Sequence, residues 1–406
     1  MIKIDHTTMA RDPLLGFFEV NKNIYWDKAS AFMAATTQNL NMDSIHWNFN
    51  DQDFSAFDWT VEPPGQLRDY YYARAKQLRE KYDYLILNCS GGSDSTTMLY
   101  AFVNQGLFVD EIFVRHAEAG TKHLGTSDQN FGASNEHSEF EYAALPLIRW
   151  LNKVSPRTKV TVHDFSLDII DDKLTWDENF IHWCGDYATP GCIVRYTHAS
   201  DKDSLNLFDK GKSVGILFGT DKPKIVMDDE NNLRLMFREA AVSSALPAAV
   251  NNGWTNTSVE LFYWHPDAKL MMAKQCHTVK RWLEEPNNRR MQHVFHQSKL
   301  NSAAHRTAYE VLVKGIVYPD YDLATFQCDK PVKNNFQEWD YWMTNFSETA
   351  GFKTYVRGMV HLYKNINHEF FNWQDDNALS KTPAPLAWKY KMVNSNRYLI
   401  GKLNTV

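Results

Sequence analysis

The sequence predicts an α/β fold of the Rossmann-like kind, in which a mainly parallel sheet carries helices on both faces. Three observations predict it. The run YLILN at 84–88 is almost wholly apolar, as is typical of a parallel strand covered on both sides. A polar turn with two glycines follows at once, and a helical pattern begins inside that turn. Apolar strand patterns then alternate with helical patterns, which is the order of right-handed β–α–β units.

The elements around the first strand follow in chain order. Apolar and aromatic residues recur every three or four positions over 66–82, which predicts a helix ahead of that strand. The helix after the turn is expected to end at Gly106, because glycine commonly closes helices. A further helix is predicted over 135–154. The later strands are predicted over 108–117, 158–165 and 213–221, with a helical insertion at the sheet edge before the last of them.

Additions are expected on both sides of this core. Pro63, Pro64 and Gly65 break the pattern and suggest a domain edge, so 1–65 is predicted to be an N-terminal additional region. Residues 66–222 form the predicted α/β core domain, and 223–406 a C-terminal α+β or helical region for substrate or interaction. Within that last region the sequence predicts a hairpin, a strand and two helices, over 223–237, 259–266, 267–285 and 305–318.

Bulk composition narrows the function class. The net charge is −6 and no basic run occurs, so the composition gives little support to non-specific nucleic-acid binding. A local basic patch on the folded surface remains an alternative. Five cysteines at wide spacing favour reduced thiols and a cytoplasmic location. No apolar run approaches the ~18 residues of a membrane helix, so no membrane partner is expected.

The turn SGGSDST at 90–96 has the composition of an anion site. The N-terminus of a helix has free N–H groups and a partial positive charge, and glycines let a phosphate approach the backbone. Hydroxyls add donors, here from Ser90, Ser93, Ser95 and Thr96. The loop lacks the lysine of the classical nucleotide loop, and it is not the dinucleotide pattern. The alternative is an ordinary glycine turn capped by serine or aspartate.

Ser90, Gly91, Gly92, Asp94 and Ser95 complete the pattern S-G-G-x-D-S between a strand and a helix. The loop therefore resembles the signature of the PP-loop ATP pyrophosphatases, the N-type group of adenine-nucleotide α-hydrolases. The resemblance covers about 82–222 and implies a HUP-type Rossmann-like core with ATP and Mg²⁺ as cofactors. It also implies that ATP is cleaved between its α and β phosphates. AMP passes to a substrate oxygen, pyrophosphate leaves, and an amine, ammonia or sulfur nucleophile then displaces AMP.

The resemblance and the strand ends give the expected site. The loop from Ser90 to Thr96 is expected to hold the phosphates, and Asp94 to orient the loop or bind the metal, with helix capping as its alternative role. Catalytic roles are expected for Asp94, Ser95 and Lys222. Gly219, Thr220 and Lys222 are expected near the α-phosphate, unless 218–223 is a simple turn. Ligands lie outside the carboxyl ends of parallel strands, and in the family that the loop resembles the adenine lies against the ends of the first two strands. The resemblance therefore implies adenine contacts at Asn88, Arg115 and His116, the last of which is otherwise a surface residue.

Three readings of the activity remain open. The leading one is an AMP-forming, ligase-like enzyme that adenylates an unknown acceptor. The second is a sulfonucleotide (PAPS or APS) reductase or sulfur-transfer enzyme, which needs a thiol near the nucleotide, and Cys89 directly precedes the loop. The third is an ATP-binding module without turnover. A PP-loop core with unfamiliar flanks is similar to stand-alone proteins of phages and bacteria, and a homo-oligomer is possible.

The acceptor is a small molecule or a nucleic acid. The second choice rests on the tail, where basic residues alternate with aromatic ones that are able to stack on bases. These residues are Trp388, Lys389, Tyr390, Lys391, Arg397, Tyr398 and Lys402. The alternative is a solvated C-terminal helix or strand.

Overall fold

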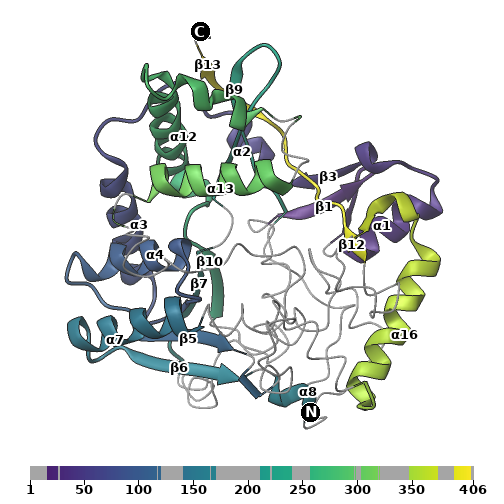
Figure 1. Cartoon of the computed structure of the whole chain (residues 1–406), viewed down its shortest axis with the longest axis horizontal. Helices are drawn as coiled ribbons and strands as arrows, with labels where there is room; N and C mark the ends of the chain where they lie inside the picture. Colours follow the sequence, from purple (N-terminus) through teal and green to yellow (C-terminus); the bar gives the residue numbers. More distant parts are fainter. Residues whose placement is uncertain are drawn as a thin grey trace.

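The centre of the molecule is a sheet of five parallel strands in the order β10-β7-β4-β5-β6 (Figure 1). The computed structural model describes residues 16–25, 28–116, 118–119, 140–164, 166–170, 211–219, 222–239, 257–296, 298, 303–318, 320, 347–373 and 388–403. The five strands are β4 (Tyr84–Asn88), β5 (Glu111–His116), β6 (Lys159–Asp164), β7 (Val214–Phe218) and β10 (Thr257–Leu261). The predicted Rossmann-like α/β class is thereby confirmed.

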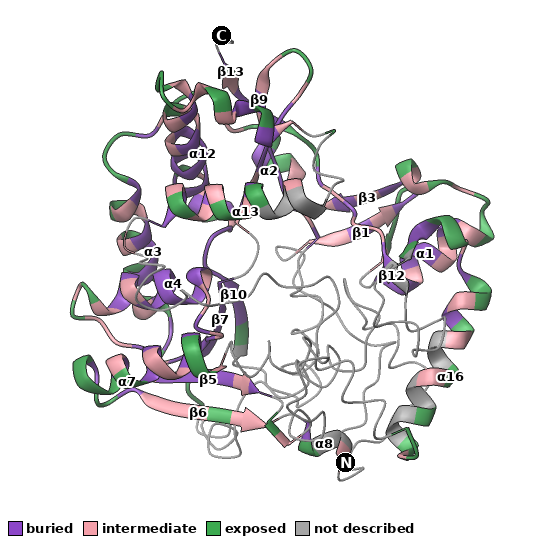
Figure 2. Cartoon of the chain, viewed as in Figure 1, coloured by how far each residue is buried: buried purple, intermediate pink, exposed green. Residues whose placement is uncertain are grey.

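Burial explains why these runs became strands. Four of the five residues of β4 and all five of β7 are buried, as the continuous apolar runs predicted for strands covered on both sides. Among the described strands, β6 pairs with β5 alone, and it is half-exposed. Figure 2 shows the contrast between the mostly buried β5 and its pink and green neighbour β6.

The helices that accompany the sheet lie close to their predicted bounds. They are α3 (Leu67–Lys81), α4 (Ser93–Val103) and α7 (Leu145–Val154). A π-helical turn, η3 (Phe140–Ala144), leads into α7, and the earlier part of the predicted 135–154 helix lies outside the described residues. The segment between β6 and β7, where the helical insertion is predicted, also lies largely outside them, apart from the short helix α8 (Leu167–Ile170). The helix α4 ends at Val103, and Gly106 follows with φ +72°.

The strand order reverses at one place in the sheet. From β4 the chain moves outward through β5 to β6, then returns to the other side of β4 for β7 and β10. In the β4–β7 pair, Leu87 lies opposite Leu217, so Asn88 and Phe218 end at the same level. Such a reversal opens a crevice at the carboxyl ends of the two strands, where α/β proteins commonly bind ligands. The predicted anion loop begins directly at the end of β4.

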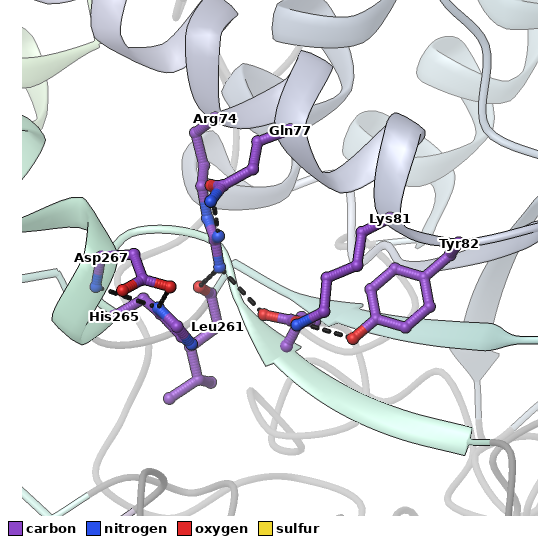
Figure 3. A network of polar contacts seen from close by, with 8 residues as sticks. Arg74, Gln77, Lys81, Tyr82, Leu261, His265 and Asp267 are labelled. Atoms are coloured by element: carbon purple, nitrogen blue, oxygen red, sulfur yellow. Dashed lines mark hydrogen bonds and ion pairs between the residues drawn. The ribbon is translucent and has the colours of Figure 1, made fainter.

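A polar network ties α3 to the far edge strand β10. Glu260 is 3 % exposed, and its carboxylate accepts hydrogen bonds from Arg74 (2.9 Å), Lys81 (2.6 Å) and the Tyr82 hydroxyl (2.5 Å). Figure 3 shows Arg74, Lys81 and Tyr82 pointing down from the helical side toward the strand that carries Leu261. Burial would raise the pKa of Glu260, but the two cations and the phenol outweigh it and lower that pKa.

The additions on either side of the core pack on one another. The N-terminal region holds β1 (Phe17–Val20), β2 (Asn23–Tyr25), α1 (Lys28–Thr37), β3 (Ile45–Asn48) and α2 (Asp51–Ser55). The predicted hairpin is β8 (Lys224–Met227) with β9 (Asn232–Met236), and β13 (Tyr398–Lys402) pairs with β9 to complete a three-stranded antiparallel sheet. The remaining elements are α12 (Lys269–Glu284), α13 (Ala303–Val317), α16 (Ala350–Asn365), β11 (Phe371–Trp373) and β12 (Trp388–Tyr390).

Aromatic side chains from distant segments form the core between these additions. Phe54 contacts Trp59, Phe237 and Tyr398, and Phe237 stacks on Trp264. Beside this cluster, the buried Lys28 of α1 forms an ion pair with the buried Glu239 after β9.

The tail forms strands. The Tyr390 ring is 0 % exposed and that of Tyr398 7 %, so neither ring faces outward for base stacking. The side chains of Trp388 and Lys389 lie outside the described residues. Among the helices that the structure describes, none is long and apolar enough to cross a membrane.

Candidate functional site

The loop after β4 has a backbone that only glycine permits at Gly91. This residue has φ +73°, and a Cβ atom added to it would lie 2.4 Å from the carbonyl carbon of Ala143 in η3. The loop is therefore pressed against the π-helical turn. The first N–H groups of any α-helix have no acceptor within the helix. Gly92 is the N-cap of α4 and has no side chain that could accept from them.

Hydroxyl groups inside the loop fix its shape. The Ser90 hydroxyl accepts a hydrogen bond from the Gly92 N–H (3.3 Å). Ser95 and Thr96 donate to the carbonyl oxygens of Gly92 (3.1 Å) and Gly91 (3.2 Å). Both side chains are thus engaged within the loop, where they hold its carbonyl groups. Ser93 is 1 % exposed, and within the described part of the chain its hydroxyl has no hydrogen-bond partner.

Asp94 does not cap the helix that carries it. Its Oδ1 accepts hydrogen bonds from Lys222 Nζ (3.1 Å) and from the Tyr318 hydroxyl, while the Tyr263 hydroxyl donates to its backbone oxygen (2.7 Å). Its side chain is 31 % exposed. Burial would raise the pKa of Asp94, but Lys222, Lys314 and the Tyr318 hydrogen bond together outweigh burial and lower that pKa. The carboxylate is therefore fixed, charged and open on one side.

Lys222 belongs to a row of alternating charges. Its Nζ also lies 3.8 Å from Glu310 of α13, and the other Glu310 oxygen lies 3.4 Å from Lys224. Burial and nearby Arg238 lower the pKa of Lys224 to about 8, although Glu310 opposes the shift. Burial would raise the pKa of Glu310, and the surrounding lysines lower it instead. With Asp94 and Lys314, the row carries more positive than negative charge, which suits a phosphate group.

The end of β7 lies directly beside this row. A Cβ atom on Gly219 would lie 3.1 Å from the Asp94 carbonyl carbon, so the strand end and the start of α4 are in close contact. The predicted neighbourhood of Gly219, Lys222 and Asp94 is therefore present in the fold. Thr220 lies outside the described residues.

The three residues expected near the adenine lie on β4 and β5. Asn88 donates to the Leu217 carbonyl oxygen (3.1 Å) and accepts a hydrogen bond from Arg115, whose guanidinium lies 4.7 Å from the Phe113 ring centre. His116 is 3 % exposed and stacks on Phe140 of η3 at 4.5 Å, so it is not a surface residue. Asn88 thus links three neighbouring strands at the carboxyl edge.

Cys89 is a poor candidate for a reactive thiol. It is 4 % exposed, and burial raises its pKa, which disfavours the thiolate that sulfur transfer requires. Cys276 is 0 % exposed, and burial raises its pKa as well. The other three cysteines, Cys184, Cys192 and Cys328, lie outside the described residues.

The donor set fits magnesium held jointly with a nucleotide. Mg²⁺ is usually bound through one or two carboxylates together with substrate phosphates. Asp94 Oδ2 carries no hydrogen bond within the described residues, whereas Oδ1 carries two. In those residues no group of three or more metal-binding side chains occurs. The site therefore offers one ionised carboxylate beside an anion loop.

Sequence reasoning missed Tyr263, Glu310 and Tyr318. Each lies far along the chain from Asp94, and no short motif surrounds it.

No protein-family model matches this chain, and no curated protein is significantly similar to it.

Proposed function

We propose that this protein is an ATP pyrophosphatase of the PP-loop type, built on a HUP-type core, that adenylates an oxygen of an acceptor substrate. The observation that carries the proposal is an S-G-G-x-D-S loop at the reversal point of a parallel sheet, with Lys222 held 3.1 Å from the loop carboxylate of Asp94. The motif and the reversal of strand order are independent features, and both suit a nucleoside triphosphate.

Each group has a role in this proposal. The N–H groups at the start of α4 and the Ser93 hydroxyl bind the β and γ phosphates. Asp94 would hold Mg²⁺, which as a Lewis acid would neutralise the growing charge of pyrophosphate. Lys222 and Gly219 would contact the α-phosphate, and the adenine would lie toward Asn88, Arg115 and His116.

The proposed reaction consists of two displacements. An acceptor oxygen attacks the α-phosphorus, and the bond to the bridging oxygen breaks, releasing pyrophosphate. The nucleophile, an amine or ammonia, then attacks the activated carbon, and AMP leaves with the oxygen. Burial of Cys89 disfavours that particular thiol as the nucleophile of a sulfur-transfer or sulfonucleotide-reducing reaction. The ATP-binding module without turnover is retained as the second candidate.

Mass-spectrometric product analysis tests the proposal. The protein is incubated with ATP, Mg²⁺ and a small-metabolite pool, and we expect AMP, pyrophosphate and an adenylated or amidated product. Asp94→Asn and Lys222→Met should each lower AMP formation by about 100-fold or more, because each removes charge stabilisation of the transition state. Asp229→Asn, in the exposed hairpin turn, is the matched control and should retain full activity. ADP as the product, or nucleotide binding without turnover, would contradict the proposal.

A further inference from the structure

The carboxylate of Asp94 is held by its surroundings in an asymmetric way. Oδ1 receives both of its hydrogen bonds, from Lys222 and from Tyr318, while Oδ2 carries none within the described residues. The two donors come from different places: Lys222 from the connection between β7 and β8, and Tyr318 from the residue after α13. A carboxylate held at one oxygen by two donors has a fixed rotamer, so its second oxygen has a fixed direction.

Tyr318 differs from its neighbouring buried tyrosines in what its hydroxyl contacts. The Tyr71 hydroxyl donates to the Val317 carbonyl oxygen (2.8 Å), and the Tyr309 hydroxyl accepts the Ile225 N–H (2.9 Å). Both of these hydroxyls therefore form hydrogen bonds with backbone groups. The Tyr318 hydroxyl instead reaches the one carboxylate in the anion loop, from 224 residues further along the chain.

The ring of Tyr318 is locked in place. It is 2 % exposed, and its centre lies 5.6 Å from that of Tyr263, which in turn lies 5.6 Å from Tyr71. The Tyr71 hydroxyl bond to Val317 fixes the backbone immediately before Tyr318, and the Tyr263 hydroxyl bond fixes the backbone of Asp94. The phenol therefore has little freedom to follow a carboxylate that moves.

We propose that Tyr318 is a positioning residue of the nucleotide site: its hydroxyl and Lys222 hold Oδ1 of Asp94 so that Oδ2 faces the metal–triphosphate. The inference rests on the proposed function, because it assigns a direction to the carboxylate that would hold Mg²⁺. A carboxylate that is free to rotate would lose conformational entropy when it binds the metal, whereas a carboxylate whose rotamer is already fixed would not. Tyr318 thus acts through Asp94 and does not itself touch the ligand.

Calorimetry with α,β-methylene-ATP, which the enzyme cannot cleave at the α–β position, tests this inference. Its Kd is measured with Mg²⁺ and with EDTA. Tyr318→Phe should raise the Kd of the magnesium complex about tenfold and leave the metal-free Kd within about twofold, since only one metal-directed group is released. Tyr309→Phe is the matched control, because it removes an equally buried hydroxyl from α13, the helix that ends directly before Tyr318, and both of its Kd values should be unchanged.

The outcomes separate the two proposals. No binding by the wild-type chain overturns the proposed function and this inference with it. If the wild-type chain binds the analogue and Tyr318→Phe leaves both Kd values unchanged, the positioning role alone is overturned. Equal weakening with and without Mg²⁺ also overturns it, because that result reports general loop damage.

A second variant keeps the inference testable if Tyr318→Phe fails to fold. Asp94→Glu keeps the charge but lengthens the side chain. The longer carboxylate can no longer accept the hydrogen bonds of Lys222 and Tyr318 with one oxygen and direct its other oxygen toward the metal at the same time. It should show the same magnesium-specific loss with Tyr318 intact. Wild-type affinity in Asp94→Glu would overturn the inference.

Discussion

At the scale of single residues, Gly91 satisfies two requirements that no other amino acid meets together. Its φ of +73° lies in the left-handed region, and its α-carbon faces the Ala143 carbonyl group with no room for a Cβ atom. The motif predicted a glycine here because a phosphate approaches the backbone. The structure adds a second reason, which is close contact with a π-helical turn of the protein itself.

Gly91→Ala should therefore destabilise the protein by about 3 kcal/mol or more, since the left-handed conformation costs about 1–2 kcal/mol and the clash with backbone atoms adds to it. Gly106→Ala is the matched control: it has φ +72° and nothing within 4 Å of an added Cβ, so it pays the conformational cost alone. Urea denaturation of both variants measures the difference. Equal losses would show that the contact with Ala143 relaxes freely.

The sequence located the loop residues but not the groups around them. Ser90 to Thr96 were predicted as a unit because the motif is contiguous and lies between a strand and a helix. Tyr318 and Glu310 could not be predicted, because their contacts with Asp94 and Lys222 depend on where α13 packs. Hydrogen bonds across such separations follow from tertiary packing and leave no local pattern.

At the scale of elements, the first strand and α13 were predicted closely, the strand predicted over 259–266 is observed over 257–261, and the pairing could not be foreseen. The first strand was predicted over 84–88, which are the bounds of β4, and α13 begins and ends within two residues of its predicted bounds. A strand was also predicted near β10, yet nothing local indicated that it would join the parallel sheet beside β7. Apolar periodicity reports local conformation, whereas the choice of a strand partner is a long-range event.

The α3–β10 network gives a stability prediction for these two elements. Glu260→Gln should lower the free energy of unfolding by about 3 kcal/mol, because it leaves the buried Arg74 without its countercharge. The pKa of Glu260 is lowered in the fold, so its contribution is full above the unfolded pKa and is lost as pH falls through the folded pKa. Urea titrations of wild type and variant should therefore converge at acidic pH.

Glu80→Gln on the same helix provides the comparison. Glu80 forms an exposed pair with Lys76 at 3.8 Å, and its loss should cost less than about 0.5 kcal/mol. A similar cost for both variants would mean that Glu260 contributes no more than a surface charge.

At the scale of the whole molecule, the regions expected to be separate share their buried surfaces. The aromatic cluster draws Phe54 from the N-terminal region, Phe237 from the hairpin and Tyr398 from the tail. The division at 65 and 222 stays a prediction. The sequence indicated breaks in composition at those points, and composition does not report which surfaces meet.

We predict that a fragment of residues 66–222 does not fold alone. It lacks β10, so the edge of β7 and the charged Arg74 lose their partners, and it lacks Tyr263 and Tyr318 beside the anion loop. Circular dichroism and urea denaturation, with the full chain as control, should show no cooperative transition. A cooperative transition would establish these residues as an autonomous domain.

The strand β13 has a consequence for how the chain acquires its fold during synthesis. It pairs with β9, yet the ribosome makes it only after α12, α13 and α16 have emerged. The β8–β9 hairpin must wait with an unpaired edge during that time, and an exposed edge invites pairing with other chains. The late closure of this sheet thus leaves the newly made chain with an exposed strand edge until its tail has been synthesised.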